Sequence, residues 1–147
     1  MNTDGSVDSA FSAPSIPSSS SVVFAEVADD GKILVAIVDP NGQRTIQRLL
    51  PDGAQDTSFT IDPTLGDLNG MEIGQLGDGR VLVWSTSPQR LIDDSTGIAR
   101  LLTNGTIDST FDPGETLPAF GAVYRNGDNS IRRLMVGNFR ELTVDGN

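Results

Sequence analysis

Three short loops in the chain carry oxygen-bearing side chains around a glycine, a pattern that can bind a metal ion. Each loop begins with an aspartate or asparagine, continues with glycine, and has a further aspartate four residues after its first residue. The first residues are Asp4, Asp52 and Asn104, and the later aspartates are Asp8, Asp56 and Asp108. Hard oxygen ligands on a tight turn are what Ca²⁺ requires.

The alternative is that these side chains only shape the turns, because Asp and Asn hydrogen-bond readily to backbone groups close by in the chain. Each loop has fewer acidic groups than an EF-hand calcium loop and spaces them differently. We therefore predict structural turns, with no metal and no other cofactor, and keep Ca²⁺ as the alternative.

Catalytic chemistry has few candidate residues, because the chain contains neither histidine nor cysteine. Asp93 and Asp94 are candidates for a carboxylate pair of the kind that glycosidases use, but their surroundings are typical of a solvated loop. The single lysine, Lys32, lies in a predicted hairpin turn. We predict no catalytic residues and no enzymatic activity, and a loop-borne hydrolase is the contrasting class.

Two arginines recur at equivalent places, Arg48 and Arg100, each eight residues before a repeated aspartate. The planar guanidinium suits repeated bidentate contacts, which favours buried structural ion pairs. The alternative is a cationic ring that faces a ligand.

Aromatic residues also recur, at Phe11, Phe59 and Phe111. We predict that they anchor the core. Trp84 and Tyr124 are the better candidates for stacking on a carbohydrate, although both lie in apolar stretches where packing is the favoured role.

The glycines of the three loops, Gly5, Gly53 and Gly105, are 48 and then 52 residues apart, which indicates an internal repeat. A second phrase, a turn followed by an apolar run, recurs at 29–38, 77–86 and 127–138. A third phrase that contains Arg-Leu-Leu occurs only twice, at 45–50 and 97–102.

Each phrase has the character of a short strand bounded by Asp-Gly or Asn-Gly turns. The first unit is predicted to contain antiparallel strands at Val22–Ala28, Lys32–Val38, Thr45–Leu50 and Gln55–Ile61. Four-stranded units that repeat every 40 to 50 residues are typical of β-propeller blades. A β-sandwich, the competing all-β fold, would not require the period.

The net charge of −10 disfavours nucleic acid and anionic membrane surfaces as partners. No run of residues is apolar and long enough to span a membrane, and the first residues lack the pattern of a secretory signal. The absence of cysteine leaves the cellular compartment open.

The phrases together resemble the delta-60 repeat, a β-propeller family of mostly large, often surface-associated bacterial proteins. The first unit matches its motif at residues 30–35 and at Arg48, Leu49, Asp52, Gly53, Asp56 and Phe59. The second unit matches at residues 78–83 and at Arg100, Leu101, Asn104, Gly105, Asp108 and Phe111. The chain departs from the family at the glycine pair after the central strand, of which only Gly137 remains. The resemblance implies a fold and carries over no catalytic residue.

We expect one partial propeller array over residues 1–147. It contains the last strand of a preceding blade at 1–13, blades at 22–61 and 71–113, and an incomplete blade without its Arg-Leu strand at 120–147. Propellers close with about four to eight blades, so the array is open or completed by other chain segments. The partners expected are proteins or further copies of the chain.

The function that follows is a non-enzymatic scaffold or interaction module in a larger assembly. An extracellular, cell-surface or virion location is favoured over the cytoplasm. A lectin-like propeller that binds a glycan is the alternative.

Overall fold

The computed structural model describes residues 3–12, 14–85 and 97–112, together with the backbone of three strands between 123 and 142. Nine strands and one short 3-10 helix are the regular elements of these residues. No helix in this part of the chain is long and apolar enough to cross a membrane. The chain is therefore all-β in its described parts, as predicted.

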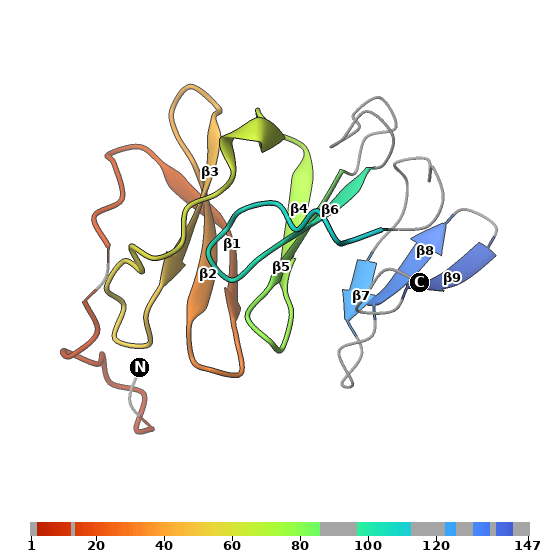
Figure 1. Cartoon of the computed structure of the whole chain (residues 1–147). Coiled ribbons are helices and arrows are strands. Elements are labelled where there is room, and N and C mark those ends of the chain that lie inside the picture. The colour runs from red at the N-terminus through yellow and green to blue at the C-terminus, as the bar shows by residue number, and fades with distance from the viewer. Residues whose placement is uncertain are drawn as a thin grey trace.

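The strands form three antiparallel sheets, each with its three strands in chain order. The first sheet contains β1 (Ser21–Val27), β2 (Ile33–Val38) and β3 (Arg44–Leu49). The second contains β4 (Met71–Gln75), β5 (Val81–Ser85) and β6 (Ile98–Leu101). The third contains β7 (Val123–Arg125), β8 (Ile131–Met135) and β9 (Asn138–Leu142). Figure 1 shows the three sheets following one another across the molecule.

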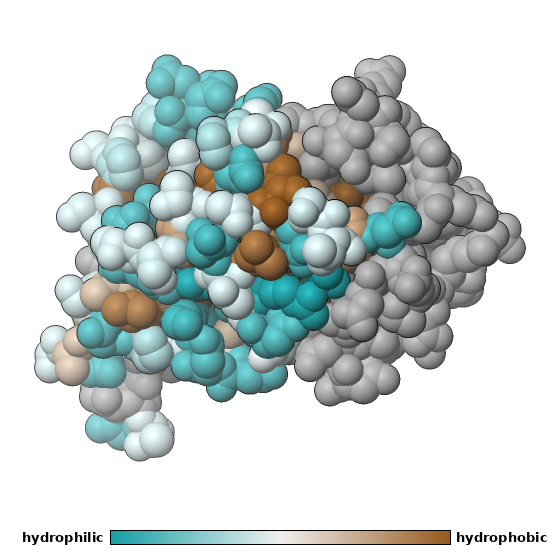
Figure 2. All heavy atoms as spheres, viewed as in Figure 1, coloured by the Kyte–Doolittle hydropathy of each residue, from teal (hydrophilic) through white to brown (hydrophobic). Residues whose placement is uncertain are grey.

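The middle strands β2 and β5 are apolar on both faces because each is covered on both sides. Leu34 and Ala36 belong to the core that joins the first two sheets, whereas Val35 and Ile37 belong to a separate cluster. The near-continuous apolar run of β2 is thus a strand buried on both faces. In the coloured part of Figure 2 polar residues cover most of the surface, and hydrophobic residues gather near the middle of the picture.

The connection between the first two sheets also contributes to the shared core. It contains the 3-10 helix η1 (Pro63–Leu65), which Asp62 caps by accepting a hydrogen bond from the Thr64 amide. Leu65 and Leu68 are buried with Met71, the first residue of β4. The first and second sheets therefore pack as neighbours through a common apolar layer.

The predicted fourth strand at Gln55–Ile61 does not form. A single bridge between Leu49 and Gln55 takes its place, and the chain then turns. The second unit repeats this feature with a bridge between Leu101 and Ile107. The reason is local, because an aspartate next to each bridge binds the backbone ahead of it and competes with strand pairing.

The prediction that the last unit lacks a third strand is wrong, because β9 pairs with β8. Two residues separate β8 from β9, whereas five separate β2 from β3. A search at fixed spacing misses a strand that follows so short a connection. The strand also lacks the Arg-Leu phrase, since Glu141 precedes Leu142 where Arg100 precedes Leu101 in β6.

Candidate functional site

The three glycine loops fold into the same turn. The Oδ1 atom of the first residue accepts a hydrogen bond from the amide two residues ahead, over 2.9 Å for Asp4, 3.0 Å for Asp52 and 3.1 Å for Asn104. The glycine that follows has a φ of +85°, +86° or +92°, which is a conformation that glycine adopts without steric strain. These side chains shape turns, as the sequence predicted.

The later aspartate of each loop organises a second turn. Its Oδ1 atom accepts from the amide of Ala10, Ser58 or Thr110 over 2.9 to 3.0 Å. Its carbonyl oxygen accepts from the amide of Phe11, Phe59 or Phe111. Within the part of the chain that the structure describes, no group of three or more metal-ligating side chains exists.

Each complete unit pairs its buried arginine with this aspartate. Arg48 donates from Nε to Asp56 Oδ2 over 2.8 Å, and its Nη2 lies 2.8 Å from the same oxygen. The guanidinium carbon of Arg48 lies 4.5 Å from the centre of the Phe59 ring. We call these three residues the first Arg-Asp-Phe cluster.

The second Arg-Asp-Phe cluster contains Arg100, Asp108 and Phe111 and has nearly the same geometry. The two donor distances to Asp108 Oδ2 are 2.8 and 2.7 Å, and the guanidinium carbon lies 4.8 Å from the ring centre. Arg48 and Arg100 are each 3% exposed. Both arginines therefore serve buried structural pairs rather than a ring of cations that faces a ligand.

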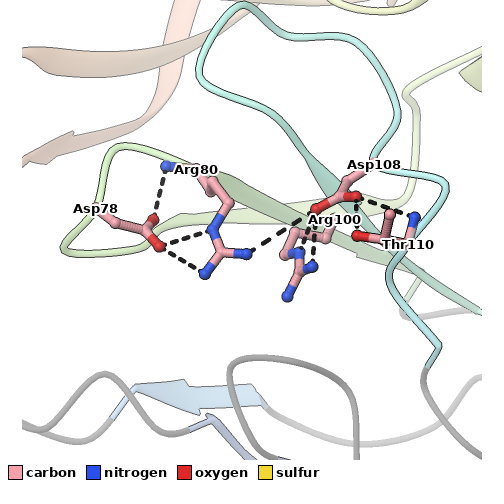
Figure 3. A network of polar contacts seen from close by, with 5 residues as sticks. All are labelled: Asp78, Arg80, Arg100, Asp108 and Thr110. Atoms are coloured by element: carbon pink, nitrogen blue, oxygen red, sulfur yellow. Dashed lines mark hydrogen bonds and ion pairs between the residues drawn. The ribbon is translucent and has the colours of Figure 1, made fainter.

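The second cluster has an additional cation, which Figure 3 shows beside Asp108. Arg80 binds Asp78 through Nε and Nη2 over 2.6 Å, and its Nη1 lies 3.9 Å from Asp108 Oδ2. Lys32 occupies the equivalent place in the first unit, where its amine lies 3.0 Å from Asp30.

The carboxyl groups of both clusters are held ionised. Burial raises the pKa of Asp56, but hydrogen bonds from Ser58 and Arg48 outweigh it and leave the pKa below its ordinary value. For Asp108, burial likewise raises the pKa, and contacts with Thr110 and Arg100 lower it further than burial raises it. Each carboxylate is therefore more acidic in the folded chain than in the unfolded chain.

These pKa shifts predict loss of stability in acid. A carboxyl with a depressed pKa stabilises the fold fully above its unfolded pKa, about 3.9, and loses that contribution as pH falls through its folded pKa. We expect the urea midpoint to be steady near neutral pH and to fall below about pH 4. Asp108→Asn should be less stable than wild type at pH 7, with the difference smaller at pH 3. A difference that stays constant across this range would contradict the assignment.

Neighbouring units are joined where the chain that follows a phenylalanine crosses the glycine turn of the next unit. We call this contact the unit junction. The Ser12 amide donates to the Asp52 carbonyl over 2.6 Å, and the Thr60 amide donates to the Asn104 carbonyl over 2.9 Å. The Asp62 amide also donates to the Gly105 carbonyl over 3.0 Å.

The glycine at each junction is required by close approach as well as by its φ. A Cβ atom at Gly105 would lie 2.1 Å from the Thr60 carbonyl oxygen. A Cβ atom at Gly53 would lie 2.8 Å from the Ser12 carbonyl oxygen and from the Phe11 ring. The repeated glycine thus lets the tail of one unit lie directly on the turn of the next.

A pocket of about 350 Å³ lies beside β1, β4 and β5. Trp84 and Phe24 contribute aromatic surface to it, and Glu26 and Glu72 contribute carboxylates. Glu26 also accepts a hydrogen bond from the Gln75 amide over 2.8 Å, which ties β1 to β4. A Cβ atom at Gly74 would lie 3.3 Å from the Trp84 ring, so this glycine makes room for the indole.

The structure brings some of the residues predicted from the sequence together, and others lie outside the part of the chain that it describes. It brings Arg48 and Phe59 together at Asp56, and it places Trp84 in a pocket wall. Asp93, Asp94 and the side chain of Tyr124 lie outside the described residues.

Sequence reasoning missed Asp62, Glu26 and Arg80. Asp62 caps η1 and accepts from the Ile107 amide of the next unit over 3.1 Å. Its position before a proline signals a cap, whereas nothing local signals the contact that Glu26 makes with the second sheet.

Comparison with known proteins agrees with the repeat. Residues 28–59 and 76–111 match the model of a family described as a domain of unknown function (DUF5122) beta-propeller. No curated protein and no solved structure matches the chain. The two matched stretches contain the middle and last strands of the first and second sheets and both Arg-Asp-Phe clusters. The two units are therefore similar to repeats of that β-propeller family.

Proposed function

We propose that the chain is a non-enzymatic scaffold of delta-60-like repeats, whose units join further repeats of the same kind in a larger assembly. Protein partners or further copies of the chain would complete the propeller. An extracellular, cell-surface or virion location suits such an assembly.

The observation that carries this proposal is the unit junction. The same backbone contact occurs twice, from Ser12 to Asp52 and from Thr60 to Asn104. In each case the tail of one unit supplies the donor, and the turn of the next unit supplies the acceptor and the glycine. A contact of this form can be added at either side without a new kind of interface, which is how repeat scaffolds grow.

The repeated charged residues support a structural role as well. Arg48 with Asp56, and Arg100 with Asp108, form buried pairs inside their own units. Such pairs fix the position of the turn on which the neighbouring unit packs, which is a structural role.

Extension of the array by one unit tests the scaffold. A copy of residues 21–51 replaces residues 1–3, so that three additional strands lead directly into the turn at Asp4. In a repeat scaffold each neighbour stabilises the next, so we expect a higher urea midpoint and a single transition with a larger m-value. A matched control carries residues 21–51 after a flexible Gly-Ser linker, which separates the added strands from the turn.

Two results would contradict the scaffold. One is an unchanged midpoint in the extended chain. The other is an equal increase in the linker control, since that would mean that joining the strands to the turn has no importance.

Glycan binding is the second candidate, and the pocket beside β1, β4 and β5 favours it. Trp84 offers a stacking surface, and the carboxylates of Glu26 and Glu72 can accept hydrogen bonds from sugar hydroxyls. We expect a glycan array to give signals with wild type that Trp84→Ala loses. Because Trp84 is the single tryptophan, its fluorescence should change when a glycan binds. An array without signals, or signals that Trp84→Ala retains, would remove this candidate.

A further inference from the structure

We propose that Asp8 and Phe11 form a binding site for the guanidinium group of an arginine on a strand of a partner repeat. The inference rests on the proposed scaffold function and names the contact through which the first turn of the chain would join another repeat. The ligand is an arginine side chain of a neighbouring repeat. It would hold the same place relative to Asp8 that Arg48 holds relative to Asp56.

The two occupied clusters define the geometry of such a site. In both, one carboxylate oxygen accepts from Nε and lies within 2.8 Å of Nη2 of the same arginine. In both, the phenylalanine three residues after the aspartate lies under the guanidinium plane. The aspartate's other oxygen binds the amide two residues ahead and so holds the carboxylate in place.

The turn at Asp8 has the same backbone hydrogen bonds as the turns at Asp56 and Asp108. Asp8 Oδ1 accepts from the Ala10 amide over 2.9 Å, and the Phe11 amide donates to the Asp8 carbonyl over 3.2 Å. No arginine or lysine of the described residues lies within ion-pair distance of Asp8. The remaining carboxylate oxygen of Asp8 therefore has the position that receives arginine in the other two copies.

Phe11 is more exposed to solvent than Phe59, as expected if no guanidinium covers its ring. Phe11 is 37% exposed, whereas Phe59 is 5% exposed. The Phe11 ring lies against Gly53, at 2.8 Å from the position of a Cβ atom on that glycine, while no atom of Phe59 comes so near Gly105. Binding of a guanidinium would thus cover a ring that is now partly in solvent.

The ligand is a guanidinium rather than an ammonium group. A guanidinium presents two N–H donors to one carboxylate and a flat face to the ring, whereas an ammonium is a compact point charge that cannot do both. The chain's net charge of −10 also favours a cationic partner group at this turn.

The extended chain with residues 21–51 joined to Asp4 provides the test, because it places a second copy of Arg48 eight residues before Asp8. A double-mutant cycle combines Arg48→Met in the added copy with Asp8→Asn. Asparagine can keep the Oδ1 acceptor for the Ala10 amide, and it replaces the charged Oδ2 acceptor with an uncharged NH2 donor. We expect coupling of at least tenfold in the unfolding equilibrium constant. The matched control, Asp4→Asn in the same loop, should show less than twofold coupling to the added arginine.

The outcomes separate this site from the function on which it rests. An extended chain that is stabilised, but shows no more coupling at Asp8 than at Asp4, overturns the guanidinium site and leaves the scaffold standing. An extended chain that is not stabilised overturns both. Replacement of the added arginine by lysine should lose most of the coupling, and full retention with lysine would overturn the assignment of the ligand.

Discussion

Replacement of Arg48 by methionine is expected to destabilise the chain by about 3 to 5 kcal/mol, which is the usual consequence of removing one partner from a buried ion pair. The change leaves the Asp56 carboxylate buried without its cation, and it removes the cation from the face of Phe59. Domains of this size are stable by about 5 to 15 kcal/mol in total. Urea unfolding followed by circular dichroism should show a much lower midpoint.

Two comparisons make this prediction specific. Arg100→Met should be less harmful than Arg48→Met, because Arg80 already lies 3.9 Å from Asp108 and can partly replace the lost charge. Lys32→Met should change stability by at most about 1 kcal/mol, since its pair with Asp30 is partly exposed to solvent. An effect of Arg48→Met no larger than that of Lys32→Met would contradict the structural role of the clusters.

Replacement of Gly105 by alanine should have the second-largest effect, a loss of about 3 kcal/mol or more. A left-handed backbone costs a non-glycine residue about 1 to 2 kcal/mol. The new Cβ atom would also displace the Thr60 carbonyl. The tail would then lose the bonds from Thr60 and Asp62 to the turn, each worth about 1 kcal/mol. Urea unfolding measures the sum.

Gly42→Ala is the matched control for Gly105→Ala. Gly42 has a φ of +81° on the turn between β2 and β3, and no atom lies within 4 Å of the position of its Cβ. Replacing Gly42 by alanine therefore measures only the cost of the left-handed backbone, a loss of about 1 to 2 kcal/mol in the free energy of unfolding. Equal losses for the two variants would mean that the junction contributes nothing to stability.

The repeat could be predicted from the sequence because it depends on local chemistry. The glycine turns, the middle strands and the pairing of Arg48 with Asp56 each follow from residues that are near one another in the chain or recur at a fixed spacing. The family match at residues 28–59 and 76–111 has the same basis.

The features that were missed depend on competition or on distant contacts. Gln55–Ile61 has the composition of a strand, but the hydrogen bonds of Asp56 turn the chain instead. β9 was missed because its connection is short. The unit junction was missed because the period places Gly53 and Gly105 in register but does not indicate which segment lies on them. Backbone contact between Thr60 and Asn104 has no signature in side-chain types.

Hydrogen exchange at the Thr60 and Asp62 amides tests most directly the claim that the units are coupled through the junction. Both amides donate to the next unit. We expect them to exchange as slowly as the amides of β2 in wild type, and we expect Gly105→Ala to accelerate their exchange while Gly42→Ala does not. Exchange of both amides in wild type at the rate of an unprotected chain would contradict the claim.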